Sequence, residues 1–431
     1  MKLWFLLVIV LAYSCEKNSE CSSLEVCDNG KCRHKDIFPI TNWEILGTCL
    51  VFIMSGLAGA SGIGGGALFV MIIVTFSHFN PSSAVALSQY SVIGTGLTAA
   101  SIKMFLRHPT RNRPLIDYDL IVILISPLLI GTSFGVIANI SSPYWLILVI
   151  LIGILIYLTI STLQSAIKHY KKETEIFNNP TLISSPCESP TDPHLQKIYS
   201  AEQQTFPLRA LLIIFSIYIF TILSSLIRGS RTFKSLAGLE FCTWSFWLAS
   251  GAILMVLIGI SIFCVNYKLK DYKIKVAYGY DFDEKDIKWD ESGCRKMVIA
   301  GVVTGFLGSV IGIGGAIIMS PVLLKIGVRP EVMAASMSFM VFFTSTVSAL
   351  QYTIAGKVNM SYALWNLAFC LLGSAFGVFV IKAIVNKYKR ASIIVMALAI
   401  SQGISAVTII VYGIYNAVTQ ERDFGFHNYC E

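Results

Sequence analysis

The amino-acid sequence predicts an all-α polytopic membrane protein: two inverted-topology repeats with broken, glycine-rich helices near the bilayer midplane, joined by two extra helices. Three observations predict this fold, namely the composition, the length of the uncharged stretches and an internal repeat. Of the 431 residues, 55% are hydrophobic and 13% are charged, against about 45–50% and 25% in an ordinary soluble domain. So few charges exclude a soluble globular enzyme, a disordered chain and a coiled coil.

Long uncharged stretches predict the membrane helices. No Asp, Glu, Lys or Arg occurs in 45–102, 120–167, 241–267, 297–324 or 391–420, and each stretch exceeds the roughly 20 apolar residues of a spanning helix. Hydrophobic segments are expected at 43–77, 83–105, 119–139, 144–165, 209–227, 243–266, 296–327, 332–352, 361–384 and 392–416. The net charge of +8 is carried by Lys and Arg between these segments. It is an orientation signal, and without a basic patch interleaved with aromatic residues we expect no nucleic-acid partner.

The N-terminus predicts export. Residues 1–14 combine a basic start with an apolar run too short to span a membrane, which is typical of a cleaved signal peptide. We therefore expect a multi-pass protein of the secretory pathway, in the plasma membrane or an endomembrane, with an extracytosolic N-terminus. The next segment, 15–42, is rich in cysteine, and its four disulfide candidates allow three pairings: Cys15, Cys21, Cys27 and Cys32. The other cysteines are scattered, and those inside helices are interpreted as packing residues.

Polar segments divide the membrane part. Residues 166–208 are rich in Asn, Pro, Ser and Thr and are expected to form a disordered cytosolic loop. Two connecting transmembrane helices follow in 209–266, and 267–295 form a second cytosolic loop. Residues 417–431 form a C-terminal tail.

The chain repeats itself, which divides the membrane part into halves at 43–165 and 296–416. The run Gly62-Ile63-Gly64-Gly65-Gly66 matches Gly312-Ile313-Gly314-Gly315-Ala316 at an offset of 250 residues. At the same offset Ala84 matches Ala334 and Ser88 matches Ser338. A later run in 131–135 matches 373–377 at an offset of 242. Ordered matches across three segments indicate two homologous halves.

Charge orients the two halves. If 43–77 crossed the membrane once, the basic segment 103–113 would lie outside, against the positive-inside rule. If 43–77 enters and returns, this segment and most other basic clusters lie in the cytosol, and only Arg228, Arg231 and Lys234 disagree. The first half then starts outside and the second inside, as in secondary transporters built from inverted repeats. The glycine runs should lie at membrane depth, where irregular backbone must be buried in protein or line a cavity.

The two glycine runs are the candidate substrate site. Backbone N–H groups converge on a ligand where side chains are absent, and helices beginning at Ala67 and Ala316 would add positive dipole ends. The alternative is that glycines only let helices pack closely; duplication at equivalent positions favours the ligand site, which needs no formal positive charge. Candidate substrate-binding residues are Gly62, Gly64, Gly65, Gly66, Ser88, Gln89, Gly312, Gly314, Gly315, Ser336 and Ser338.

Enzyme signatures are not found in the sequence. It contains no G-x-x-x-x-G-K-[ST] phosphate loop, no H-E-x-x-H, and no G-x-S-x-G at a strand-to-helix turn. The six histidines are scattered without ligand spacing. We therefore predict no catalytic residue, no cofactor and no metal site.

At these residues the sequence resembles the TauE/SafE family of sulfite-exporter-type membrane proteins. The family pattern is a duplicated Gly-x-x-Gly-x-x-Gly-Ile-Gly-Gly-Gly segment followed by an apolar stretch with a proline. The first copy includes Gly56, Gly59 and 62–66, and the second Gly305, Gly308, 312–315 and Pro321. Met71 replaces the proline of the first copy, and Ala316 replaces the third glycine of the second. The resemblance covers 43–416 except the two polar loops, and it implies export of sulfite or small organosulfur anions such as sulfonates.

Two functional hypotheses follow. The first is a secondary transporter of small sulfur oxyanions in the lipid bilayer, driven by a proton or sodium gradient. The second is a non-transporting membrane receptor or assembly scaffold that uses the cysteine-rich segment and the cytosolic loops. The duplicated glycine runs favour the transporter, because a receptor has no need of two broken helices.

Overall fold

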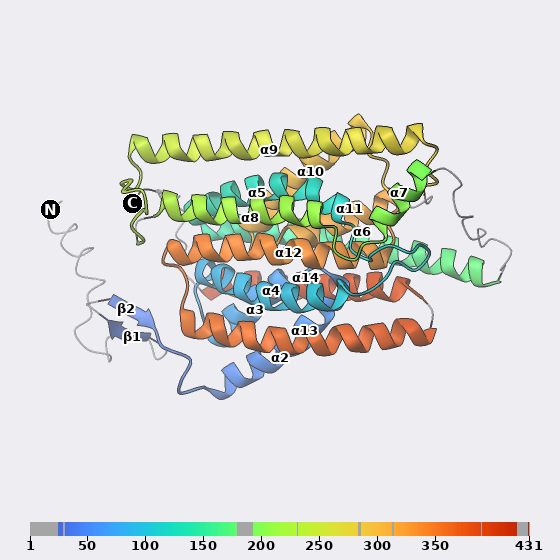
Figure 1. The fold of residues 1–431 in the computed structure, drawn as a ribbon. Coiled ribbons are helices and arrows are strands. Elements are labelled where there is room, and N and C mark those ends of the chain that lie inside the picture. Colours follow the sequence, from blue (N-terminus) through green and yellow to red (C-terminus); the bar gives the residue numbers. More distant parts are fainter. Residues whose placement is uncertain are drawn as a thin grey trace.

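The computed structural model describes residues 25–28, 31–178, 193–230, 232–282, 286–312, 314–388, 390–419 and 430. The expected signal peptide, Cys15, Cys21 and the end of the C-terminal tail lie outside them. The described part confirms the helical membrane fold: nine of its helices are long and apolar enough to cross a membrane. Their axes run roughly along one direction, with the β1–β2 hairpin at one end of the bundle and α7 toward the other (Figure 1).

Two short strands and thirteen helices make up this part of the chain. The strands β1 (Glu25–Asp28) and β2 (Lys31–His34) pair antiparallel. The helices of the first half are α2 (Asn42–Ser61), α3 (Gly66–Ser77), α4 (Pro81–Lys103), α5 (Tyr118–Ser141) and α6 (Tyr144–Asn178). Between the halves lie α7 (Pro193–Glu202), α8 (Leu208–Arg228) and α9 (Trp244–Ala277). The second half contains α10 (Glu291–Val310), α11 (Gly315–Ile326), α12 (Pro330–Ile354), α13 (Met360–Tyr388) and α14 (Ser392–Thr419).

Helices α2 and α3 form a hairpin whose two outer ends lie on the same side of the bundle. His34 Nε2 lies 2.8 Å from the carbonyl oxygen of Ser77, and the His34 ring stacks on Phe79 with centroids 3.8 Å apart. Trp43 near the start of α2 contacts Phe76 near the end of α3. The stretch 43–77 therefore enters and returns, as the positions of the basic residues indicated.

The α10–α11 hairpin opens toward the opposite end of the bundle. Arg113, in the loop after α4, forms an ion pair with Asp286 just before α10. The backbone N–H of Asp117 donates to Ser336 Oγ, 2.9 Å away, in the second turn of α12. The segments on both sides of this hairpin thus meet at the α4–α5 loop, one span away from the outer ends of the first hairpin.

The two halves interlock through exchanged helix pairs. Helix α2 packs on α13, and its counterpart α10 packs on α5, the counterpart of α13. The counterparts α4 and α12 pack on each other, as do α6 and α14. This exchange is what a two-fold axis in the membrane plane would produce. It supports the hypothesis of inverted repeats.

The helices that connect the halves are flanking elements. In the most apolar 18-residue stretch of α9 only 17% is buried, against 83% in the corresponding stretch of α5. Figure 1 shows α9 along one edge of the bundle. Its exposed apolar side chains, such as Met255 and Phe263, suit contact with lipid.

Three helical segments differ from the expected loops. Helix α6 continues to Asn178, α7 forms within the segment expected to be disordered, and α9 continues to Ala277. Tertiary contacts explain the differences: Glu173 on α6 accepts a hydrogen bond from the backbone N–H of Ser392 at 3.0 Å. Lys275 at the end of α9 pairs with Glu202 of α7 at 2.8 Å. The rest of the loop, 179–192, lies outside the described residues.

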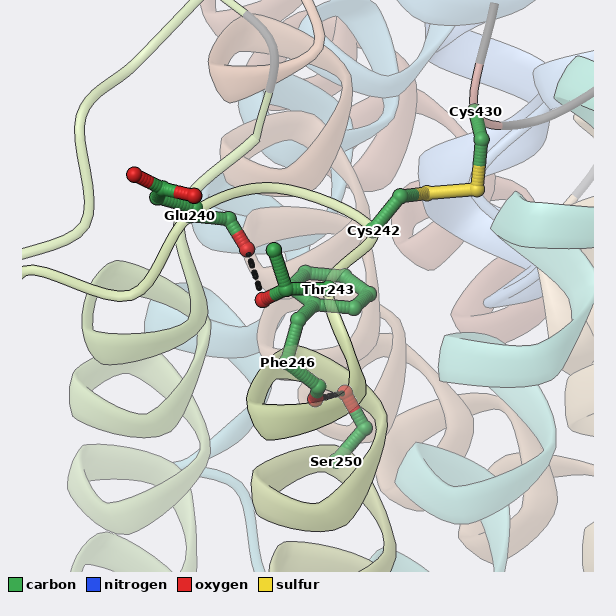
Figure 2. Close-up of a disulfide and its surroundings, with 6 residues drawn as sticks. All are labelled: Glu240, Cys242, Thr243, Phe246, Ser250 and Cys430. Carbon is green, nitrogen blue, oxygen red and sulfur yellow. Dashed lines mark hydrogen bonds between the residues drawn. A yellow bond between two sulfur atoms is a disulfide. The ribbon is translucent and has the colours of Figure 1, made fainter.

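A disulfide joins two cysteines for which the sequence predicted no disulfide. Cys242, just before α9, bonds Cys430 in the C-terminal tail (Figure 2). Cys27 is also disulfide-bonded, and it lies opposite Cys32 in the hairpin; the pairing of the candidate cysteines stays open. The packing interpretation holds for Cys264, Cys294 and Cys370, which are buried free thiols.

We expect the two ends of the bundle to be labelled from opposite sides of the membrane. In a Cys49→Ala background, Asn80→Cys and Lys357→Cys should react with an impermeant maleimide applied to intact cells. Asn112→Cys and Lys288→Cys should react only after permeabilisation, because the fold separates them from position 80 by one span. Labelling of positions 80 and 112 from the same side would contradict the re-entrant hairpin.

Candidate anion-binding site

Both hairpins break at glycines in conformations that other residues rarely adopt. Helix α2 ends at Ser61, and Gly62, Gly64 and Gly65 then have φ of +81°, +77° and +77°. In the second half Gly312 and Gly314 have φ of +71° and +75°. Positive φ costs glycine little, because it has no Cβ. The predicted breaks are thus present, although α3 and α11 begin at Gly66 and Gly315, one residue before the expected starts.

The N-terminal ends of α3 and α11 are buried and carry no side-chain cap. The N–H of Phe69 donates to the Gly65 carbonyl oxygen at 3.2 Å and closes the first turn of α3. The N–H of Ile317 does the same for Gly314 at 3.4 Å. The Gly314 N–H already donates to the Gly308 carbonyl oxygen at 3.2 Å. The helix dipole makes both ends favourable for negative charge. The candidate donors are the N–H groups that precede the helical ladders, those of residues 66–68, Gly315 and Ala316.

The two breaks both lie close to one residue, Val92 in the middle of α4. A Cβ added at Gly64 would lie 2.7 Å from Val92 Cγ1 and 2.8 Å from Val341 Cγ1. A Cβ added at Gly314 would lie 4.0 Å from Val92 Cγ1 and also 4.0 Å from Ser345 Oγ. Gly64 is therefore tightly enclosed by side chains, whereas a Cβ at Gly314 would make only ordinary van der Waals contacts.

Ser345 on α12 is a functional candidate that sequence reasoning missed. Its side chain is 1% exposed, and its hydroxyl has no hydrogen-bond partner in the described part of the chain. A buried hydroxyl without a partner is costly, so this group is a free donor beside Gly314. The repeat offset of 250 matches Ser345 with Thr95, which is also buried. That pairing of small hydroxyl residues was the signal available in the sequence.

Ser88 and Gln89 contact the glycine run of the other half. Ser88 Oγ lies 3.1 Å from the carbonyl oxygen of Gly312 and 2.7 Å from that of Val85. Gln89 Nε2 donates to the same Gly312 oxygen at 3.1 Å. These donors stabilise the end of the first helix of the second hairpin. The structure therefore brings them to the predicted site but gives them a supporting role.

Ser336 and Ser338 lie on α12 and face other groups. Ser336 Oγ accepts from the backbone of Asp117, which ties the start of α5 to α12. Ser338 Oγ donates to Ala334 O at 2.7 Å and accepts from Lys103 Nζ at 3.0 Å. Neither hydroxyl forms a hydrogen bond with the start of α3 or α11.

A buried cation lies beside the first break, where the sequence predicted no formal charge. The side chain of Lys103 is 6% exposed. Its ammonium donates to the carbonyl oxygens of Gly59 at 2.8 Å and Ala60 at 3.0 Å, at the end of α2. A cation at the C-terminal end of a helix is favourable because the dipole is negative there. Sequence reasoning grouped Lys103 with the cytosolic basic residues and missed this position.

A polar cavity of about 890 Å³ lies at the end of the bundle that faces the α4–α5 loop. Its lining includes Arg113, Asp117, Asp119, Lys268 and Lys275. Asp117 caps α5 by accepting from the N–H of Leu120 at 3.0 Å, as expected for a helix-start residue. Burial and the neighbouring Asp119 carboxylate raise the pKa of Asp117 to about 6, although Arg113 opposes the shift.

These features define a polytopic helical membrane protein with two hairpins that break at buried glycines, where the candidate site lies. The family model for Sulfite exporter TauE/SafE matches residues 3–183 and 297–407. Sulfite exporter TauE/SafE family protein 2 of Arabidopsis thaliana is 29% identical over 414 residues, which cover 91% of this chain and 88% of the relative. Family protein 1 of the same plant is 30% identical over 400 residues, with 90% and 88% covered. No solved structure matches the chain.

The chain therefore belongs to the sulfite exporter TauE/SafE family. This is a family of membrane transporters and not of enzymes, in agreement with the prediction from motifs. The resemblance found in the glycine runs is confirmed over most of the chain.

We expect Gly314→Ala to abolish anion binding without loss of the fold. The added methyl group has no neighbour closer than 4.0 Å, so it displaces no protein atoms. Its main structural cost is the backbone conformation, with φ of +75° and ψ of 138°, which lies outside the left-handed helical region and costs at least about 1–3 kcal/mol in a residue other than glycine. Gly327→Ala controls for a methyl group added at positive φ, because Gly327 has φ of +104°, ψ of 7° and open space at the other end of α11. Sulfite binding and thermal unfolding of both purified variants should show loss of binding only in Gly314→Ala, with the larger destabilisation there. Normal binding by Gly314→Ala would remove this glycine from the site.

We expect Asp117→Asn to stabilise the protein above about pH 6 and to have little effect near pH 4. Because the folded-state pKa of Asp117 is raised, wild-type stability falls as the pH rises from the unfolded pKa to the folded one. Asparagine caps helices as well as aspartate does and carries no charge. Asp290→Asn makes the same change at the exposed N-cap of α10 and is the control. Thermal unfolding in detergent between pH 4 and 8 measures both; equal pH profiles for Asp117→Asn and wild type would contradict the assignment.

Proposed function

We propose that this protein is a secondary transporter that exports sulfite or small organosulfur anions, which bind between the starts of α3 and α11. One observation carries the proposal: two buried helix N-termini without side-chain caps lie close to Val92, with the unpartnered hydroxyl of Ser345 beside one of them. Buried donors without acceptors are rare in proteins. A small oxyanion supplies acceptors for them.

Electrostatics favours an anion over a neutral solute at this position. Each helix end is equivalent to roughly half a positive charge. The Lys103 ammonium lies close by, since it donates to Ala334 O at 3.1 Å and the Ala334 backbone also encloses Gly62. No charge within the glycine runs opposes binding. These positive groups favour an anion, and a dianion such as sulfite gains most from them.

The arrangement of the hairpins supports alternating access. The α2–α3 hairpin opens to one end of the bundle and the α10–α11 hairpin to the other. Rocking of one repeat against the other around a fixed central site would expose that site to each side in turn. The polar cavity near Asp117 and Lys275 would serve as the cytosolic entrance. Family membership and the names of the plant relatives support sulfite export over the receptor or scaffold hypothesis.

We expect Ser345→Ala to weaken sulfite binding about tenfold or more, because a hydrogen bond to a charged group contributes about 1.5–3 kcal/mol. Ser55→Ala is the control: Ser55 is fully buried, but its hydroxyl donates to the carbonyl of Phe52 in its own helix. The measurement is efflux of labelled sulfite from proteoliposomes, with sulfate, methanesulfonate and chloride as competitors, with and without proton or sodium gradients. Absence of efflux for every anion by well-folded wild-type protein would favour the receptor or scaffold instead.

A further inference from the structure

The Lys103 ammonium is enclosed by four neutral oxygen atoms. Three are carbonyl oxygens, of Gly59 at 2.8 Å, Ala60 at 3.0 Å and Ala334 at 3.1 Å. The fourth is the hydroxyl oxygen of Ser338 at 3.0 Å. These oxygens come from the end of α2 and the beginning of α12. An ammonium group has three N–H donors, so the enclosure offers one acceptor more than hydrogen bonding requires.

No carboxylate neutralises this cation. In the described part of the chain no salt bridge involves Lys103. The acidic residue of α2, Glu44, is near the other end of that helix, and Glu331 of α12 lies in its first turn. The Asp117 carboxylate, at the start of α5, accepts a hydrogen bond from the backbone N–H of Leu120. A buried charge without a counter-ion is costly, so the carbonyl dipoles must replace its hydration shell.

The equivalent helix end in the second half has no cation. There Asn139 Nδ2 donates to the carbonyl of Val310 at 2.6 Å, and Tyr352 Oη donates to that of Ser309 at 3.1 Å. Ser88 and Gln89 contact the Gly312 carbonyl. Neutral hydrogen-bond donors therefore suffice to satisfy the carbonyl groups where such a helix ends. The oxygen enclosure around Lys103 is a specific feature of the first half and not a general need of the fold.

We propose that these four oxygens form a monovalent-cation site, and that Lys103 fills it as a cation attached to the chain. Carbonyl oxygens at helix C-terminal ends and unwound backbone are the groups that bind alkali cations in transporters with broken helices. An ammonium group and K⁺ are similar in size, and oxygens at 2.8–3.1 Å suit both. At this position the protein needs no free sodium or potassium. If the proposed anion site is correct, this fixed charge also offsets part of the substrate charge.

Removing the ammonium should leave a site that a free cation can occupy. In Lys103→Ala the side chain beyond Cβ is lost, and the four oxygens surround an empty space. We expect K⁺ and NH₄⁺ to raise its melting temperature in a saturable, concentration-dependent way. Na⁺ should act more weakly, and N-methyl-D-glucamine not at all. Wild type should show no such differences among the chloride salts.

Lys103→Met is the matched control, because its apolar chain fills the space without a charge. It should be destabilised in every salt, because the carbonyls lose their donor, and show no preference among the cations. Adding Ser338→Ala to Lys103→Ala removes one of the four oxygens and should raise the K⁺ concentration at half-maximal stabilisation by about tenfold. Purification of each variant in potassium and in N-methyl-D-glucamine chloride tests folding directly.

Three results would overturn the proposal. They are equal cation responses of the alanine and methionine variants, an unchanged K⁺ midpoint after Ser338→Ala, and failure of the alanine variant to fold in potassium while the methionine variant folds. None of these readouts depends on transport. Sulfite binding by Lys103→Met, measured separately, tests the proposed function alone.

Discussion

The fold depends on how the backbone is satisfied where two helices stop inside the membrane. In a bilayer each unpaired N–H or C=O group costs several kcal/mol. The ends of α2 and α10 meet this requirement with protein groups: Lys103 for one, and Asn139 and Tyr352 for the other. The beginnings of α3 and α11 have no such cap. The protein thus satisfies the carbonyls at these two ends itself, and the uncapped N–H groups at the starts of α3 and α11 are the donors that the proposed anion site would use.

The glycines fall into two sets. For one set, close packing of helices explains why a side chain is absent, and the other set remains the candidate for ligand binding. Gly56 on α2 lies against Gly373 and Gly377 of α13, where any side chain would meet backbone atoms. Gly305 lies against Leu128 in the exchanged pair. These glycines permit the close helix contacts that hold the halves together. Gly314, in contrast, has no neighbour closer than 4.0 Å to an added Cβ, and its positive φ, not close helix packing, requires glycine there.

The sequence predicted the features that periodic patterns encode. Long stretches without charged residues located the helices. The two matching glycine runs located the breaks, and the positions of the basic residues predicted the re-entrant hairpin. It could not predict contacts made by long side chains between distant segments. Lys103 reaches a helix end 43 or 44 residues earlier in the chain, and Cys242 bonds a cysteine 188 residues away. Offset matching also treated Gly65 and Gly315 as equivalent, although only Gly65 has a positive φ; Gly315 is the first residue of α11.

The two halves share a backbone plan but differ in charge, and this difference has consequences for a transport cycle. In the proposed cycle, rocking of one repeat against the other would change the surroundings of both breaks. The neutral donors at the end of α10 could then exchange one hydrogen-bond partner for another at a cost of about 1 kcal/mol each. The Lys103 ammonium cannot leave its oxygens so cheaply, because a charge in a low-dielectric interior must keep its ligands or its hydration. The contact between the end of α2 and the start of α12 should therefore persist in both access states, and the larger movement falls to the neutral break of the second half.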